Sequence, residues 1–294
     1  MAQLAAQRFR LSDYLPWLDR AGRVSPFKSA VFALLLLPGL YVGWQLAIGG
    51  YARPYILANH DLGLWAIRLL FVSLAVTPLR QVLAWPRLIQ VRRMVGVAAF
   101  LYALAHFLFY ALDKSLQWGV IATEIALRYY LTIGFVALVL ISALGVTSTD
   151  GMVRRLGGKR WAWLHRSVYL IGILAVVHFF IQVKADVTEP FIMGGLFAWL
   201  MLYRVLAKRG AVSFVALIIL AVVLCGLTAG AEAFYYHLKT NADMLRVLSA
   251  NLSLGIGLRP AWLVGGIGLL VALLSLARPL WSKSRERRPA PARA

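Results

Sequence analysis

The chain has 294 residues, of which 61% are hydrophobic and only 14% are charged, and its mean hydropathy is +0.76. Soluble globular chains contain roughly 45–50% apolar and about 25% charged residues, so this composition excludes an ordinary soluble domain. Apolar stretches of about 20 residues recur along the sequence, and each is long enough to cross a bilayer as a helix. The composition therefore predicts an all-α, polytopic membrane protein.

The apolar stretches predict about eight transmembrane helices. Pro38 and Pro78 fall inside two of them and should kink them, which membrane helices tolerate. The expected spans are 29–48, 62–84, 94–112, 131–147, 165–184, 191–207, 212–235 and 261–280.

The basic residues sort onto alternate loops of this arrangement. With the N-terminus on the inner side, 23 of the 31 Lys and Arg residues lie on inner segments and 7 on outer ones. Cytoplasmic loops of membrane proteins carry this excess of positive charge. We therefore expect both termini in the cytoplasm, and we attribute the net charge of +20 to topology rather than to nucleic-acid binding.

The expected organisation has four parts: a cytoplasmic N-terminal segment 1–28, a six-helix core 29–210, a two-helix membrane extension 211–281 and a basic cytoplasmic tail 282–294. The polar residues 208–210 separate the core from the extension. The first 28 residues are polar and mixed, and they show no cleavable signal peptide. The single cysteine, Cys225, excludes an internal disulfide and a covalent c-type haem motif.

Two histidines lie in apolar surroundings on separate expected helices. His106 is 12 residues from the inner start of its span and His178 is 13 residues from the start of its own, which places both about 18–20 Å deep. Ionisable groups at such depth are costly and are commonly functional. Two imidazoles facing each other in a helical bundle could ligate a b-type haem, whereas two separate proton-relay histidines are the alternative.

The other three histidines lie near the membrane surfaces. His165 is on the same expected helix as His178, about 20 Å closer to the cytoplasm. This offset suits a second haem and electron transfer across the membrane. His60 and His237 lie at or beyond the outer surface, and we interpret them as exposed polar residues.

The histidine pattern resembles the ferric reductase and NADPH oxidase transmembrane superfamily, because His165 and His178 are separated by 12 residues and His106 lies on an earlier helix. The segments RLIQVRRMVGVAAFLYALAHFLFYAL, TSTDGMVRRLGGKRWAWLHRSVYLIGILAVVHFFIQVK and VTPLR are more specifically similar to the MsrQ (YedZ) family. The resemblance covers residues 29–208. It implies that 29–210 is a ferric reductase-like haem-binding core and that His106, His165 and His178 ligate haem iron.

The same resemblance implies a membrane electron-transfer subunit that holds two haems b and allows bound FMN. Electrons would come from a cytosolic flavin reductase or flavin, or from a quinol. They would pass to a periplasmic molybdenum-containing methionine sulfoxide reductase that repairs oxidised envelope proteins. The chain would be a multi-pass protein of the bacterial inner (plasma) membrane, and a redox subunit rather than a stand-alone enzyme.

Two other functions stay open at this point. The first is a metal-ion or oxygen reductase of the ferric reductase type, in which the outer haem reacts directly. The second is a proton-coupled transporter that uses the histidines as a relay. Such transporters commonly contain inverted repeats and broken helices near the midplane, and neither is evident in the sequence.

Four arginines are candidate contacts for haem propionates or a flavin phosphate. Arg92 and Arg93 stand 14 and 13 residues before His106, where four-histidine members of the superfamily carry a ligand histidine. A guanidinium cannot ligate iron but pairs well with carboxylates and phosphates, although a purely topological role for both stays open. Arg166 belongs to the same basic inner surface. Arg68 is a buried cation that either meets an outer haem propionate or extends to the outer surface.

Overall fold

The computed structural model describes residues 15–19, 21–183, 186–210 and 212–277. Within these ranges the regular structure is helical, and the one extended pairing is a single bridge between Leu18 and Val24. The all-α polytopic fold is therefore confirmed. Residues 1–14 of the expected N-terminal segment, Arg20, Lys184 and the expected tail 282–294 lie outside the described residues.

Seven helical stretches among the described residues are long and apolar enough to cross a membrane, and they correspond to the first seven expected spans. The eighth expected span, 261–280, corresponds to α12 (Pro260–Ser275), an apolar helix of 16 residues that is shorter than these seven, and residues 278–280 lie outside the described residues. The seven stretches are α1 (Pro26–Ala47), α2 (Pro54–Val82), α3 (Ile89–Asp113) with the turn η2 (Pro86–Leu88), α5 (Tyr129–Val146), α7 (Gly158–His165) with α8 (Val168–Gln182), α9 (Thr188–Lys208) and α10 (Phe214–Thr240).

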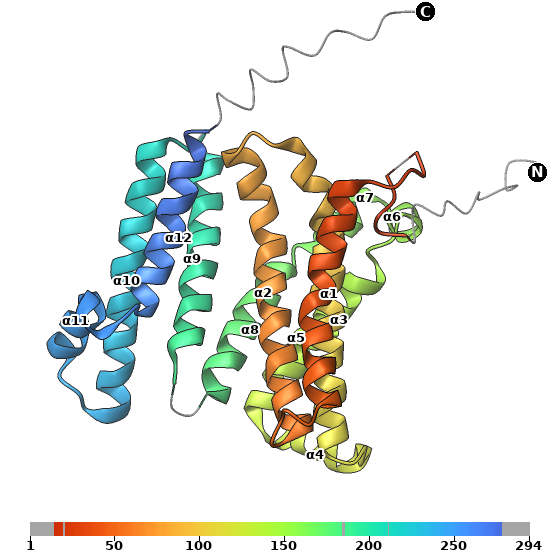
Figure 1. Ribbon diagram of the computed structural model, residues 1–294, viewed down its shortest axis with the longest axis horizontal. Coiled ribbons are helices and arrows are strands. Elements are labelled where there is room, and N and C mark those ends of the chain that lie inside the picture. The colour runs from red at the N-terminus through yellow and green to blue at the C-terminus, as the bar shows by residue number, and fades with distance from the viewer. Residues whose placement is uncertain (1–14, 20, 184–185, 211, 278–294) are drawn as a thin grey trace, which may run out of the picture. The chain divides into compact units, whose positions relative to one another are not determined.

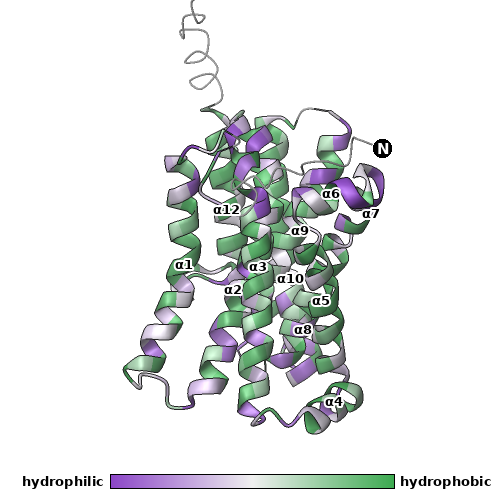
Figure 2. Ribbon diagram, turned by 90° about the vertical axis from the view of Figure 1, so that its right-hand side faces the viewer, coloured by the Kyte–Doolittle hydropathy of each residue, from purple (hydrophilic) through white to green (hydrophobic). Residues whose placement is uncertain are grey.

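Short helices occupy segments between the expected spans. They are α4 (Trp118–Leu127), α6 (Asp150–Leu156), α11 (Met244–Leu252) and the turn η3 (Leu254–Ile256). Gly157 separates α6 from α7 with φ +77° and ψ 146°, a conformation that is essentially restricted to glycine. Figure 2 shows that α6 and α7 carry many hydrophilic residues, whereas α3 and α5 are mostly apolar. This pattern fits an end of the bundle that faces water.

The described chain forms two compact units, and α2 and α8 each contribute to both. Unit 1 comprises Met1–Ser73 and Gln90–Ala175, and unit 2 comprises Leu74–Ile89 and Val176–Ala294. Within unit 2, α9, α10 and α12 lie side by side (Figure 1). A β-carbon added at Gly268 would lie 2.8 Å from the β-carbon of Ala221. Small residues thus allow α10 and α12 to approach closely, as is common between membrane helices.

A tyrosine hydroxyl replaces a helical hydrogen bond beside Pro38. Tyr102 on α3 donates to the carbonyl oxygen of Leu35 at 2.8 Å and accepts from the backbone N–H of Gly39 at 2.7 Å. In a regular helix those two backbone groups would bond to each other. An inserted side chain of this kind bends a helix without leaving its polar groups unsatisfied. In unit 1 it also fixes α3 against α1.

An arginine performs the corresponding role beside Pro78. Proline has no N–H, so the carbonyl oxygen of Leu74 loses its partner within α2. The Nη2 of Arg204 on α9 donates to this oxygen at 2.6 Å, and its Nη1 donates to the carbonyl oxygen of Leu200 at 2.7 Å. In unit 2, a residue that the charge pattern marks only as topological therefore joins α9 to the kink in α2.

Glu124 fastens α4 to the end of α3. Its carboxylate accepts from the Tyr110 hydroxyl at 2.7 Å and contacts Lys114 and Arg128 at 3.3 and 3.2 Å. The hydrogen bond from Tyr110 is the main reason why the pKa of Glu124 is lowered, and Lys114 adds to the effect. A lowered pKa in the folded state stabilises the protein above the ordinary value of 4.5, and this contribution is lost as the pH falls through the folded-state pKa.

We therefore expect Glu124→Gln to lower the free energy of unfolding by roughly 1 kcal/mol at neutral pH, and by less in acid, where the wild-type carboxylate is itself protonated. Thermal unfolding in detergent at several pH values measures the difference. Asp113→Asn, which removes an exposed carboxylate at the end of α3, is the control. An equal loss of stability at every pH would contradict the ionic role of Glu124.

Candidate functional site

His106 lies on α3 in unit 1 and is half-buried. Its Nδ1 is 2.8 Å from the backbone carbonyl oxygen of Asn59 on α2. A carbonyl oxygen can only accept, so Nδ1 is the donor. In the neutral ring the lone pair then belongs to Nε2, the nitrogen that can ligate a metal while Nδ1 donates to the carbonyl.

Gly63 makes room for this arrangement. A β-carbon at Gly63 would lie 2.7 Å from Nδ1 and 2.9 Å from Cε1 of His106. Gly63 is one helical turn after Asn59 on α2, so the missing side chain leaves the space in which the imidazole lies. Neither Asn59 nor Gly63 is among the site residues that the sequence predicts. A glycine within an apolar span was the available signal, since glycine there often marks a close approach.

His165 is the last residue of α7, and the turn 166–167 separates it from α8. The expected span 165–184 therefore corresponds to α8, and His165 lies just before that helix, at the end of α7. Its Nδ1 donates to the carbonyl oxygen of Trp161 at 3.1 Å, and its ring stacks on the Trp161 indole with centroids 3.8 Å apart. Its Nε2 lies 3.4 Å from the hydroxyl of Ser148.

Trp161 is itself held in place, because its Nε1 donates to the carbonyl oxygen of Thr147 at the end of α5 at 2.9 Å. His165 thus resembles His106 in having Nδ1 on a backbone carbonyl, and its Nε2, the nitrogen that would ligate iron, contacts the Ser148 hydroxyl. Trp161 and Ser148 were not singled out by the sequence analysis, because their contacts depend on how the short helix α7 folds back toward the end of α5.

His178 lies on α8, is half-buried and belongs to unit 2. Phe180 on the same helix contacts Phe191 of α9, with ring centroids 4.8 Å apart, so this part of α8 packs in an aromatic and apolar environment. His106 and His165 belong to unit 1. The structure thus places His106 and His165 in the same unit. The pairing of His106 with His178 stays a prediction.

The four candidate arginines have different surroundings. Arg93 forms an ion pair with Asp150 at 2.5 Å, with both side chains about 45% exposed, so it ties α3 to α6. Arg92 and Arg166 are exposed. The Arg68 guanidinium carbon lies 5.2 Å from the ring centroid of Trp65, a cation–π contact that the sequence analysis did not consider.

The donor chemistry fits a haem better than a bare metal ion. Among the described residues, no three His, Cys, Asp or Glu side chains come together in a group that could hold a metal ion. His106 and His165 each present a single imidazole with its tautomer set by a carbonyl, and single histidines on different helices are the usual axial ligands of haem in helical bundles.

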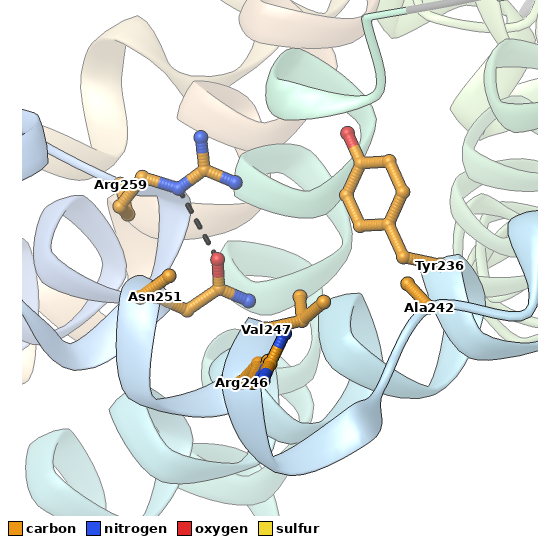
Figure 3. A pocket seen from close by; sticks show the side chains of 7 residues that line it. Tyr236, Ala242, Arg246, Val247, Asn251 and Arg259 are labelled. Carbon is orange, nitrogen blue, oxygen red and sulfur yellow. Dashed lines mark hydrogen bonds between the residues drawn. The ribbon is translucent and has the colours of Figure 1, made fainter.

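A separate polar cluster lies in unit 2, where α10, α11 and the start of α12 meet. Arg259 donates from Nε to the Oδ1 of the buried Asn251 at 3.2 Å, and its Nη2 pairs with the fully buried Glu232 of α10 at 2.5 Å. The ion pair compensates a carboxylate that would otherwise be costly to bury. The adjoining cavity of about 360 Å³ (Figure 3) is lined by Tyr236, Ala242, Arg246, Val247, Ala250, Asn251 and Arg259.

Comparisons with known proteins match this chain to one family and to several named relatives. Residues 62–176 match the family described as "Ferric reductase like transmembrane component". The protein-methionine-sulfoxide reductase heme-binding subunit MsrQ of Rhodospirillum rubrum is 43% identical over 187 residues, which cover 63% of this chain and 88% of the relative. The subunit of the same name from Xanthomonas campestris pv. campestris is 43% identical over 194 residues, with the same coverage.

The subunit from Xanthomonas axonopodis pv. citri is 42% identical over 194 residues, again with 63% of this chain and 88% of the relative covered. No solved structure matches the chain. Identity above 40% over most of the relatives' length is ample to establish kinship, and the matched family lies on the segment that carries His106 and His165. The chain therefore belongs to the MsrQ family.

Proposed function

We propose that this chain binds haem b and carries electrons across the bacterial inner membrane, from a cytosolic flavin reductase, flavin or quinol to a periplasmic molybdenum-dependent methionine sulfoxide reductase. The relatives are named as heme-binding subunits of a protein-methionine-sulfoxide reductase, which supports both the cofactor and the partner. The observation that carries the proposal is the donation of Nδ1 by two half-buried histidines to backbone carbonyls, since this prepares Nε2 for iron.

His106 and His178 would hold an outer haem, and His165 would hold an inner one. When bound, haem supplies a one-electron carrier whose potential is tuned by its axial ligands and their hydrogen bonds. Hydrogen bonds to backbone carbonyls would orient the rings of His106 and His165, and the helices that carry the histidines are largely apolar. The apolar spans thus provide the low-dielectric environment of the electron path.

The basic inner surface would receive the electron donor. Arg92, Arg93 and Arg166 are exposed enough to meet haem propionates or the phosphate of FMN, and guanidinium groups bind both through charge-assisted hydrogen bonds. For Arg93 this requires sharing or releasing the ion pair with Asp150. Arg68, on α2, would pair with a propionate of the outer haem. Its guanidinium lies over the Trp65 ring in this structure.

The proposed topology places both termini in the cytoplasm, with residues 29–210 as the haem-binding core and 211–281 as an added membrane extension. The positive charge on alternate segments supports this orientation. The ion pair of Glu232 with Arg259 and the hydrogen bond of Arg259 to Asn251 support a structural role for the extension, because they join α10, α11 and the start of α12.

Absorption spectroscopy of the purified protein in detergent tests the proposal directly. A Soret band and a sharp α-band on reduction are expected, and His165→Ala should remove about one of the two haems while leaving the outer component intact. Reduction by a cytosolic flavin reductase with FMN should slow in the same variant. His237→Ala, which alters an exposed histidine, is the control. Full haem content with normal reduction in His165→Ala would exclude the inner site.

A further inference from the structure

The geometry points to Gly63 as a positioning residue for His106. Because Gly63 has no side chain, the imidazole can lie against the Asn59 carbonyl, and this contact helps to set the reduction potential of the haem that His106 binds. This inference rests on the proposed haem-binding function. It adds a residue of α2 to a site whose expected ligands all lie on α3, α7 and α8.

The contact between the two helices leaves no room for a side chain at position 63. A β-carbon there would be 2.7 Å from Nδ1 and 2.9 Å from Cε1 of His106, and carbon atoms in contact normally lie at about 3.5–4.0 Å. The imidazole is the end of a side chain that can rotate, so a methyl group at position 63 would displace the ring rather than unfold the helix pair. The displaced ring would lose its 2.8 Å contact with the Asn59 oxygen.

The rest of α3 resists a compensating movement. Tyr102, one turn before His106, is bonded to Leu35 and Gly39 of α1 at 2.8 and 2.7 Å. Moving α3 would disturb these bonds, whereas rotating the ring breaks its hydrogen bond to the Asn59 carbonyl and leaves the Tyr102 bonds intact. The strain at position 63 is therefore expected to appear at the His106 side chain.

The hydrogen bond affects the electronic character of the ligand. Donation of Nδ1–H to a carbonyl makes Nε2 more basic and restricts the ring orientation. A more basic ligand stabilises ferric over ferrous haem, so losing the bond raises the reduction potential. A structural role alone would change stability but would not move the potential of one haem selectively.

The test is potentiometric titration of the haem α-band in wild-type protein and in Gly63→Ala. We expect one component to shift to a more positive potential, by on the order of a tenfold change in the ferric–ferrous equilibrium, about 59 mV, or to be lost, while the other component is unchanged. Gly43→Ala is the matched control, because a β-carbon at this helical glycine of α1 meets nothing within 4 Å. The same potentials in Gly63→Ala and Gly43→Ala would overturn the inference.

A double-mutant comparison separates positioning from a general packing defect. His106→Ala removes the ring, so Gly63→Ala should then add no further loss of haem and no further loss of thermal stability. An equal effect of Gly63→Ala with and without His106 would show that the glycine acts elsewhere and would overturn the inference. Wild-type protein without haem would overturn the proposed function and this inference together, whereas haem with unmoved potentials would overturn the inference alone.

Discussion

Replacing either His106 or His178 by alanine is expected to remove the same haem component, and the double substitution is expected to remove little more. A bis-histidine haem iron has one imidazole on each axial side, so the loss of either histidine disrupts the same centre. Pyridine haemochrome analysis should show a loss of about one of two haems in each variant. The reduced α-band should lose the same spectral component in both.

His237 provides the control, because it is exposed and its Nδ1 donates to the carbonyl oxygen of Ala242 at 3.0 Å. His237→Ala should keep both components. If His106→Ala and His178→Ala removed different components, and the double variant removed both, the two histidines would not share one haem. His165 would then be the candidate second ligand of the haem bound by either His106 or His178.

The membrane spans could be predicted from the sequence because they depend on the length and hydropathy of each segment, which are local properties. The seven stretches among the described residues follow the apolar runs closely. The main departure is α2, which begins at Pro54 rather than near residue 62. His60 therefore lies within the helix, although its side chain is exposed as expected.

The candidate ligands could also be found from the sequence, because a histidine in an apolar run is unusual in itself. Their partners could not. The Asn59 carbonyl is a backbone atom, and its contact with His106 depends on the rotation of α2 against α3. The same holds for Tyr102 beside Pro38 and for Arg204 beside Pro78. The prolines predict opened helices, but the side chain that fills each opening comes from a neighbouring helix.

The largest effect on stability is expected from Arg204. Arg204→Leu removes the donor to the Leu74 carbonyl, whose helical partner is missing because position 78 is proline. A buried carbonyl without a hydrogen bond costs about 1–3 kcal/mol, and lipid offers no replacement donor. We therefore expect the thermal unfolding midpoint in detergent to fall clearly, together with the yield of folded protein.

Pro78→Ala supplies the missing N–H within α2, so Arg204→Leu should cost less in that background, with a coupling of at least roughly 0.5 kcal/mol between the two sites. Arg209→Leu is the matched control, because it removes an exposed inner positive charge close to Arg204 in the sequence and so tests for an effect of topology. If Arg204→Leu and Arg209→Leu lowered the stability equally, and if Pro78→Ala did not rescue Arg204→Leu, the role of Arg204 at the kink would be contradicted. Rescue by Pro78→Ala would show that the arginine stabilises the protein through the carbonyl left open by the proline.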